Sequence, residues 1–276
     1  MQVLKRLFDF YINSSIHVAL AVCGLTWVTL LNFNVGADLD FMYFIFFATV
    51  TGYNFVKYFG LAKFHHRGLA NWLKVIQIFS FLCFLGLVYF TFKLKGDTIV
   101  YFGVLGIITF LYAIPFIPKK IFMEAGNLRA ISGLKIYVIA FVWSGVTVII
   151  PLLNENYSLD NDAIIEVIQR YLFVLIAILP FEIRDMKYDS IKLSTIPQRI
   201  GIVKTKIIGV SLIIVMFLLE FFKDEFWLNN TIIFGIICLL LLLLLLFSSK
   251  SQKQYYSGFW VEGIPILWAI LVTANY

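Results

Sequence analysis

Charged residues and cysteines are both scarce in this sequence, and each scarcity excludes a class of protein. Only 14% of the 276 residues are charged while 61% are apolar, compared with about 25% and 45–50% in soluble domains. The composition therefore excludes an ordinary soluble domain, which has no way to cover so much apolar surface. The three cysteines, Cys23, Cys83 and Cys238, form no CxxC pair, which argues against a disulfide scaffold or a zinc site.

Long apolar runs occupy most of the chain instead. A transmembrane helix needs about 20 mainly apolar residues to cross the hydrocarbon layer, and lipid satisfies no exposed backbone groups. We therefore predict an all-α membrane bundle of about nine transmembrane helices, which forms a single domain over residues 1–276. The predicted spans lie near residues 13–33, 41–62, 72–92, 98–117, 133–153, 167–183, 205–222, 230–248 and 258–274.

The basic residues indicate how these helices are inserted. When nine spans are threaded in order, all but four of the 22 lysines and arginines fall on the side of the N-terminus; the exceptions are Lys93, Lys95, Arg170 and Lys223. Cytoplasmic segments carry the excess of basic residues in membrane proteins. We therefore predict an N-in, C-out, multi-pass protein of the cell membrane, with its basic side facing the cytosol. This topology accounts for the net charge of +6, so we expect membrane lipid and no nucleic acid among the partners.

Acidic residues mixed with basic ones occur in one predicted cytosolic segment, 181–189. Glu182, Asp185 and Asp189 are spaced so that their carboxylates share one face of a helix. Hard oxygen ligands suit Mg²⁺, which takes one or two carboxylates and completes its shell with water and substrate phosphates. Arg184 and Lys187 are close enough to bind the same phosphates by charge. The alternative is a solvated helix end in which the basic residues neutralise the acidic ones.

This segment resembles the second aspartate-rich motif of the UbiA superfamily of intramembrane prenyltransferases. It is most similar to the arm that prenylates dihydroxynaphthoate, whose motif reads N-D-I-R-D-x-x-x-D followed by T-L-x-x-R-L-G. Four positions of the first part match: Ile183, Arg184, Asp185 and Asp189. Phe181 and Glu182 replace the motif's Asn and first Asp, and residues 195–201 resemble its tail.

The resemblance implies a function and a set of site residues. It implies Mg²⁺-dependent transfer of a prenyl group from an isoprenyl diphosphate to a small lipophilic acceptor, such as an aromatic quinone precursor. The implied metal ligands are Glu182, Asp185 and Asp189, of which Asp185 and Asp189 are also candidate catalytic residues. The candidate substrate contacts are Arg184, Lys187, Lys119, Lys135, Arg199 and Asn54.

The first aspartate-rich motif of that family, N-D-x-x-D, is missing at the end of the second predicted span. Asn54 matches the motif's Asn, but Phe55 and Tyr58 stand where acids belong, and no Asp or Glu occurs between Asp40 and Asp97. One interpretation is that a cation replaces a metal ion here, for which Lys57 is our candidate catalytic residue; Lys63, His65, His66 and Arg67 are the other cations nearby. The other interpretations are loss of catalysis and a substrate without a diphosphate.

A non-enzymatic protein of the same fold, acting as a lipid or partner scaffold, is therefore the alternative function. A transporter is disfavoured because its charged site would lie at the membrane midplane. The sequence also predicts where two acidic residues of the predicted spans 205–222 and 258–274 lie. Glu262 should face the bundle interior, where it either orients an acceptor or, as we favour, pairs with a polar group. Glu220 should extend to the outer membrane surface.

Overall fold

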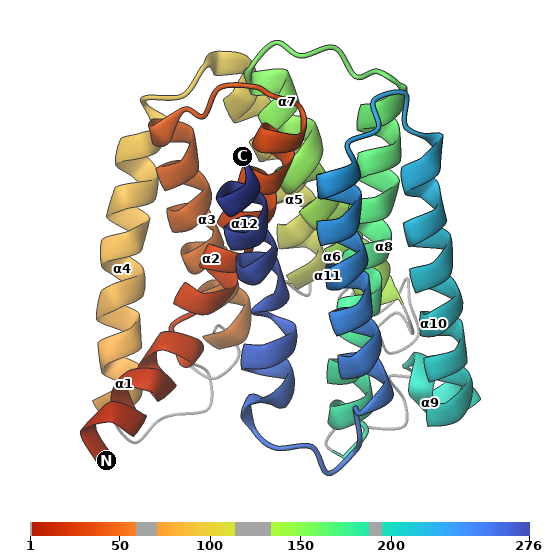
Figure 1. Ribbon diagram of the computed structural model, residues 1–276. Helices are drawn as coiled ribbons and strands as arrows, with labels where there is room; N and C mark the ends of the chain where they lie inside the picture. Colours follow the sequence, from red (N-terminus) through yellow and green to blue (C-terminus); the bar gives the residue numbers. More distant parts are fainter. Residues whose placement is uncertain (1, 59–70, 114–133, 188–194) are drawn as a thin grey trace, which may run out of the picture.

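Every regular element that the structure describes is helical. The structure is a computed structural model that describes residues 2–58, 71–113, 134–187 and 195–276 (Figure 1). Over these residues it confirms the predicted all-α membrane bundle.

Each of the nine predicted spans overlaps a helical segment of the described residues, of which seven, or eight with a bent pair, qualify as membrane spans. Seven are long and apolar enough to cross a membrane on their own. They are α3 (Leu39–Tyr58), α4 (Asn71–Thr91), α6 (Leu134–Ser144) continued by η3 (Gly145–Ile149) and α7 (Ile150–Asn154), α8 (Asn161–Asp185), α10 (Ile202–Leu218) continued by η5 (Leu219–Phe222), α11 (Leu228–Leu246), and η6 (Tyr256–Val261) continued by α12 (Ile264–Asn275). α1 (Gln2–Asn13) and α2 (Ile16–Asn32) together form an eighth candidate span, and α5 (Gly96–Ala113) contains a shorter apolar stretch.

The first segment is broken where the sequence turns polar. α1 and α2 meet at an angle of 55°, and Ser15 adopts a left-handed conformation with φ of 64°. α1 buries none of its side chains, whereas most of α2 is buried. The predicted first span is therefore one buried helix, α2, preceded by an amphipathic helix that lies beside the end of the bundle (Figure 1).

α2 is the central helix of the bundle. It packs against α3 on one side, α12 on the other, and η3 and α7 behind. The remaining contacts join α3 to α4, α5 to α6, α6 to α8, α8 to α10, and α10 through α11 back to α12. Gly24 permits the close approach of α2 and α12, because a Cβ there would lie 3.0 Å from the Pro265 carbonyl oxygen.

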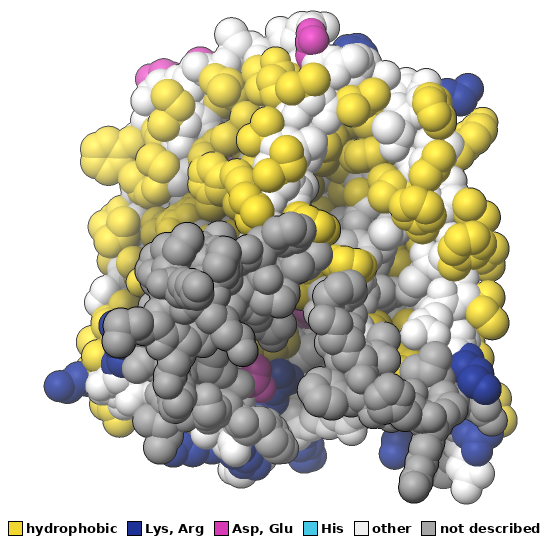
Figure 2. All heavy atoms as spheres, turned by 180° about the vertical axis from the view of Figure 1, so that it is seen from behind, with side chains coloured by type: hydrophobic (Ala, Val, Ile, Leu, Met, Phe, Trp, Pro, Cys, Tyr) yellow, Lys and Arg dark blue, Asp and Glu magenta, His cyan; other side chains and the backbone are white. Residues whose placement is uncertain are grey.

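The two ends of the bundle differ in charge. We call the end where α1 begins the basic end; α3 and α8 end there and α6 begins there. The opposite end, where α8 begins and α10 is followed by Asp224 and Glu225, is the acidic end. In Figure 2 most of the basic side chains lie along the lower rim, the basic end, and apolar side chains cover the surface between the two ends. This pattern is the one expected of a protein that spans a membrane.

Candidate functional site

The end of α8 brings two pairs of oppositely charged side chains together at the basic end. Glu182 is buried, with 2% of its surface exposed, and accepts a hydrogen bond and ion pair from Lys135 Nζ at 2.9 Å. Lys135 lies at the start of α6, which packs along α8. Two predicted site residues from distant parts of the sequence therefore meet, and the immediate partner of Glu182 is a lysine.

Asp185 is the more accessible carboxylate of this helix end. Its Oδ1 accepts a hydrogen bond from Arg184 Nε at 2.7 Å, while Oδ2 has no protein partner among the residues that the structure describes. The Arg184 guanidinium also lies 5.2 Å from the centre of the Phe181 ring, within the range of a cation–π contact. Phe181, which replaces the Asn of the family motif, thus packs its ring against the arginine.

Lys57 lies at the end of α3 and donates a hydrogen bond to the Asn13 carbonyl oxygen at 3.2 Å. The Tyr58 hydroxyl donates to the same oxygen at 2.7 Å. Lys57 is exposed to solvent at the end of its helix, although many protein atoms lie around it. No carboxylate in the described part of the chain forms an ion pair with it.

Glu262 shares these properties and belongs to the same region. It follows η6 directly, is surrounded by protein yet partly accessible, and interacts electrostatically with Lys57 and Arg184. We call Lys57, Arg184 and Glu262, which come from α3, α8 and the η6–α12 junction, the open cluster. On the rear face, acidic and basic side chains are visible toward the basic end (Figure 2).

Asn54 is engaged within the protein. Its Nδ2 donates to the Ser14 carbonyl oxygen at 2.9 Å and to Ser80 Oγ at 2.8 Å, and its Oδ1 accepts from Ser15 Oγ at 2.8 Å. Both amide hydrogens are therefore used. The predicted substrate contact joins the α1–α2 bend to α3 and α4.

The remaining predicted residues are dispersed. Lys187 is exposed just after α8, and Arg199 is exposed in the short helix α9 (Ile196–Ile200), which packs on α8 and α10. Asp189 and Lys119 lie outside the described residues, as do the other cations that follow α3: Lys63, His65, His66 and Arg67.

The carboxylates at the basic end fit a metal ion only in part. Within the described ranges, no three His, Cys, Asp or Glu side chains gather closely enough to hold one. Glu182 is buried against Lys135, which already neutralises it. Asp185 does fit, because its free Oδ2 is a hard oxygen ligand near the protein surface, and Mg²⁺ needs only one or two carboxylates when phosphates complete its shell.

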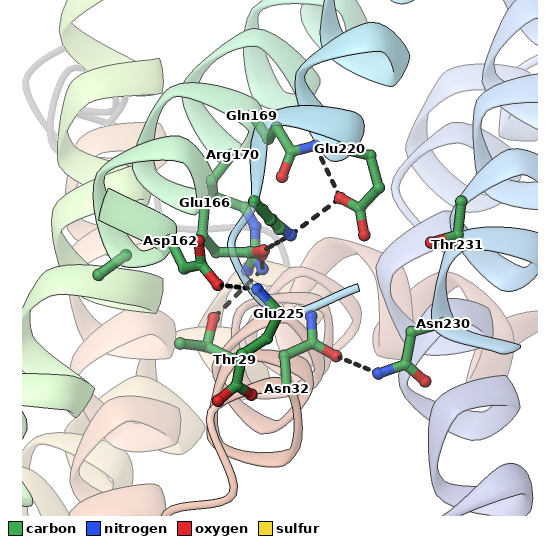
Figure 3. A network of polar contacts seen from close by, with 12 residues as sticks. Thr29, Asn32, Asp162, Glu166, Gln169, Arg170, Glu220, Glu225, Asn230 and Thr231 are labelled. Atoms are coloured by element: carbon green, nitrogen blue, oxygen red, sulfur yellow. Dashed lines mark hydrogen bonds and ion pairs between the residues drawn. The ribbon is translucent and has the colours of Figure 1, made fainter. Parts of the chain in front are cut away.

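A second group of buried charges, at the acidic end, was not anticipated from the sequence (Figure 3). Arg170 has no exposed surface; it donates to Glu166 Oε1 at 2.7 Å and to the Leu25 carbonyl oxygen at 2.8 Å. Lys223 bridges Glu166 and Glu220, at 2.9 Å to each. We call Glu166, Gln169, Arg170, Glu220 and Lys223 the Arg170 network. The i, i+4 spacing of Glu166 and Arg170 was the available sequence signal.

The network corrects the expectation for Glu220. This side chain does not extend to the membrane surface: it is 8% exposed and accepts a hydrogen bond from Gln169 Nε2 at 2.9 Å. Burial is the largest single influence on the pKa of Lys223, and it lowers that pKa. The negative charges of Glu166 and Glu220 together outweigh burial, so the pKa of Lys223 is raised. Each charge of the network has an opposite charge as its partner.

Comparison with known proteins supports the fold assignment. No protein-family model matches the chain, and no curated protein matches its sequence. A solved structure of digeranylgeranylglyceryl phosphate synthase matches 99% of this chain and 100% of its own, with a TM-score of 0.57 and 14% sequence identity. At this identity the match shows a shared fold, which confirms the predicted polytopic helical membrane bundle.

Proposed function

We propose that this protein transfers a prenyl group from an isoprenyl diphosphate to a small lipophilic acceptor, within the membrane and at its basic end. The observation that carries the proposal is the open cluster. Lys57 and Arg184 come from different helices, both interact electrostatically with Glu262, and are not both neutralised by a carboxylate among the described residues. The shared fold with digeranylgeranylglyceryl phosphate synthase supports the same class of reaction.

The cations supply what departure of the diphosphate requires. Negative charge develops on the leaving group as its bond to the allylic carbon breaks, and preorganised positive groups stabilise that charge best in a dry site. Lys57 would bind the diphosphate as a point charge and Arg184 through its planar fork. Lys135, held by Glu182 at 2.9 Å, would add a third cation fixed in place by its buried partner.

Mg²⁺ belongs to this proposal through Asp185 and Asp189. When bound, the ion would neutralise diphosphate oxygens that the protein cations do not reach. Asp185 has the free Oδ2 for this role, with Arg184 orienting the carboxylate from its other oxygen. Glu182 serves better as the anchor of Lys135 than as a ligand. Lys57 then stands where the family's first acidic motif would hold a second ion.

Aromatic side chains between α3, α5 and α6 suit the allylic cation and the prenyl tail. Trp143 Nε1 donates to the Tyr53 hydroxyl at 2.8 Å, and the rings of Phe55 and Phe110 are stacked with centres 6.5 Å apart. Faces of aromatic rings attract positive charge. The basic residues at this end support an orientation in which the site opens to the cytosol, in the cell membrane.

The test measures binding of geranylgeranyl diphosphate to the purified full chain in detergent, with and without Mg²⁺. We expect Asp185→Asn to remove the gain in affinity that Mg²⁺ provides. Lys57→Gln should weaken binding about tenfold or more, because one charge-assisted contact is lost. Lys206→Gln is the matched control: Lys206 also lies at the basic end but donates to the Leu246 carbonyl oxygen, so its affinity should change less than about twofold. A folded wild-type protein that binds no isoprenyl diphosphate would overturn the proposal.

A lipid-binding or partner scaffold is the second candidate. The pairing of Glu182 with Lys135 and the absence of the first acidic motif favour it. The two candidates separate on turnover: a transferase releases diphosphate when an acceptor is supplied, whereas a scaffold binds the prenyl diphosphate and leaves it intact.

A further inference from the structure

Glu262 lies where the last membrane segment loses its regular helical geometry. The π-helical turn η6 ends at Val261, α12 begins at Ile264, and Glu262 lies between them. Gly263 permits the break, because a Cβ there would lie 2.6 Å from the Phe259 carbonyl oxygen. π-helical turns inside helices occur frequently at functional sites.

The Glu262 carboxylate has no hydrogen bond or ion pair with any described residue. A carboxylate surrounded by protein within a membrane segment is normally paired, since the uncompensated charge is unfavourable. The Arg170 network shows that this chain pairs its other interior acids. Lys57 and Arg184 interact with Glu262 electrostatically, but they donate their hydrogen bonds to Asn13 and Asp185, respectively.

Tyr11 of α1, which interacts electrostatically with Glu262, is also committed elsewhere. The Phe259 carbonyl oxygen can only accept a hydrogen bond, so His17 Nε2, 3.0 Å away, is the protonated ring nitrogen. His17 Nδ1 is then an acceptor and takes the hydrogen of the Tyr11 hydroxyl at 2.7 Å. Tyr11 is close enough to interact electrostatically with Glu262, but it has no second hydrogen to donate. Among the described residues, none donates a hydrogen bond to the Glu262 carboxylate, which is left as an acceptor.

We propose that Glu262 binds the hydroxyl group of the prenyl acceptor and accepts its proton during transfer. The inference rests on the proposed function and deepens it. The bond between the allylic carbon and the diphosphate oxygen breaks, and the diphosphate keeps the electron pair. A bond forms between that carbon and the acceptor oxygen, and the hydroxyl proton passes to the Glu262 carboxylate, from which solvent later removes it.

This assignment limits the chemical class of the acceptor. A neutral lipophile with a hydroxyl group satisfies Glu262, whereas a carboxylate placed at the same position would repel it at close range. The structure therefore favours a neutral alcohol or phenol over an aromatic carboxylate, which separates this chain from the dihydroxynaphthoate arm that its α8 motif resembles. Lys57 and Arg184 remain available to the diphosphate.

The test compares three small probes with the same naphthalene ring: 1-naphthol, 1-naphthoate and 1-methoxynaphthalene. Binding is measured on the full chain in one detergent, with geranylgeranyl diphosphate present. The variants are Glu262→Gln, which keeps the side-chain shape, and Glu262→Asp, which keeps the carboxylate. Comparing variants in the same micelles cancels the partition of each probe into detergent. Thermal unfolding of each variant establishes that it is folded.

We expect wild type to bind 1-naphthol about tenfold or more tightly than either other probe, because only 1-naphthol donates a hydrogen bond to the carboxylate. Glu262→Gln should reduce this preference to about threefold or less, and Glu262→Asp should retain part of it. Both variants should still bind geranylgeranyl diphosphate, because Lys57 and Arg184, which would contact it, are unchanged. If the variants bind the diphosphate but the probe preference is the same as in wild type, the Glu262 inference is wrong and the proposed function stands. If wild type binds no diphosphate, both fail.

Discussion

The acidic end and the basic end both place charged side chains inside the bundle, but they satisfy those charges to different degrees. In the Arg170 network each carboxylate and each cation has a partner of opposite charge within 2.9 Å. In the open cluster the members influence one another without an ion pair between them. Asp162, also at the acidic end, is hydrogen-bonded as well: its carboxylate accepts hydrogen bonds from the backbone amides of Asp224 and Glu225.

The difference separates a structural use of charge from a functional one. A buried charge with an oppositely charged partner holds helices in register, and removing one partner leaves the other uncompensated. A charge that is enclosed but incompletely paired is retained at an energetic cost, and a ligand can supply the missing partner. We therefore expect mutations at the acidic end to reduce stability and mutations in the open cluster to reduce binding, of the diphosphate at Lys57 and Arg184 and of the acceptor at Glu262.

The largest loss of stability should come from replacing Arg170, the central residue of the Arg170 network. Arg170→Met leaves Glu166 with Lys223 alone and leaves the Leu25 carbonyl oxygen and Thr147 hydroxyl without this donor. We expect a loss of about 3–5 kcal/mol in the free energy of unfolding, measured by denaturant titration in detergent. Arg184→Met, the same substitution in the open cluster, should cost about 1 kcal/mol or less because Arg184 is partly solvated. Equal losses for the two variants would contradict the comparison.

A smaller loss of stability should follow from replacing Asn54, which lies at the basic end but whose side chain is hydrogen-bonded within the protein. Asn54→Ala removes three hydrogen bonds between helices, and at about 0.6 kcal/mol each in membrane bundles we expect a loss of about 2 kcal/mol. Thr51→Val is the control on the same helix, because the Thr51 hydroxyl is buried without a partner; its stability should change by about 0.5 kcal/mol or less. A stable Asn54→Ala protein that fails to bind diphosphate would show instead that Asn54 contacts substrate.

The interaction energy between Lys135 and Glu182 should be smaller than that of a fully buried ion pair, since only Glu182 is buried. A double-mutant cycle with Lys135→Met and Glu182→Gln should give an interaction energy of about 1 kcal/mol, measured as the stability of the four proteins without Mg²⁺. Zero coupling would mean that Glu182 is free for a metal ion, as the family resemblance implied.

The smallest effect concerns a tyrosine outside the membrane segments at the acidic end. The Tyr157 hydroxyl donates a hydrogen bond to Asp160 Oδ2 at 2.5 Å, which raises the pKa of Tyr157 to about 12. The folded state holds this proton more tightly than the unfolded state, where a tyrosine pKa is about 10. The contribution to stability is therefore complete below pH of about 10 and is lost as the pH rises toward about 12. The stability of Tyr157→Phe should be less sensitive to pH over that range; identical pH profiles for variant and wild type would contradict the assignment.

The sequence was sufficient to predict the membrane fold but not the pairing of its charges. Apolar runs located the nine helical segments because lipid requires long apolar helices. They did not locate the bend between α1 and α2, which depends on the left-handed conformation of Ser15. Hydropathy also could not show that Glu220 turns inward to Gln169 and Lys223, because that choice depends on a helix far away in the sequence.

The candidate site was predicted unevenly for the same reason. The α8 motif identified Asp185, Arg184 and Glu182 as neighbours, and the structure places them at one helix end. The lysine that meets Glu182 is 47 residues away in the sequence, so its role as a partner rather than a free cation could not be derived from spacing. Glu262 was recognised as an interior acid, but that it has no partner among the described residues became visible only once Tyr11 and His17 were placed.

The most direct test replaces one lysine at each end of the bundle with glutamine. Lys57→Gln and Lys223→Gln make the same change in charge, and both stability and affinity for geranylgeranyl diphosphate are measured for each. We predict that Lys223→Gln lowers the free energy of unfolding by about 2 kcal/mol or more and leaves diphosphate affinity within about twofold of wild type. Lys57→Gln should show the opposite pattern: stability within about 1 kcal/mol of wild type and affinity reduced about tenfold or more. If Lys57→Gln destabilised the protein without weakening diphosphate binding, the open cluster would be a structural feature and the proposed site would be wrong.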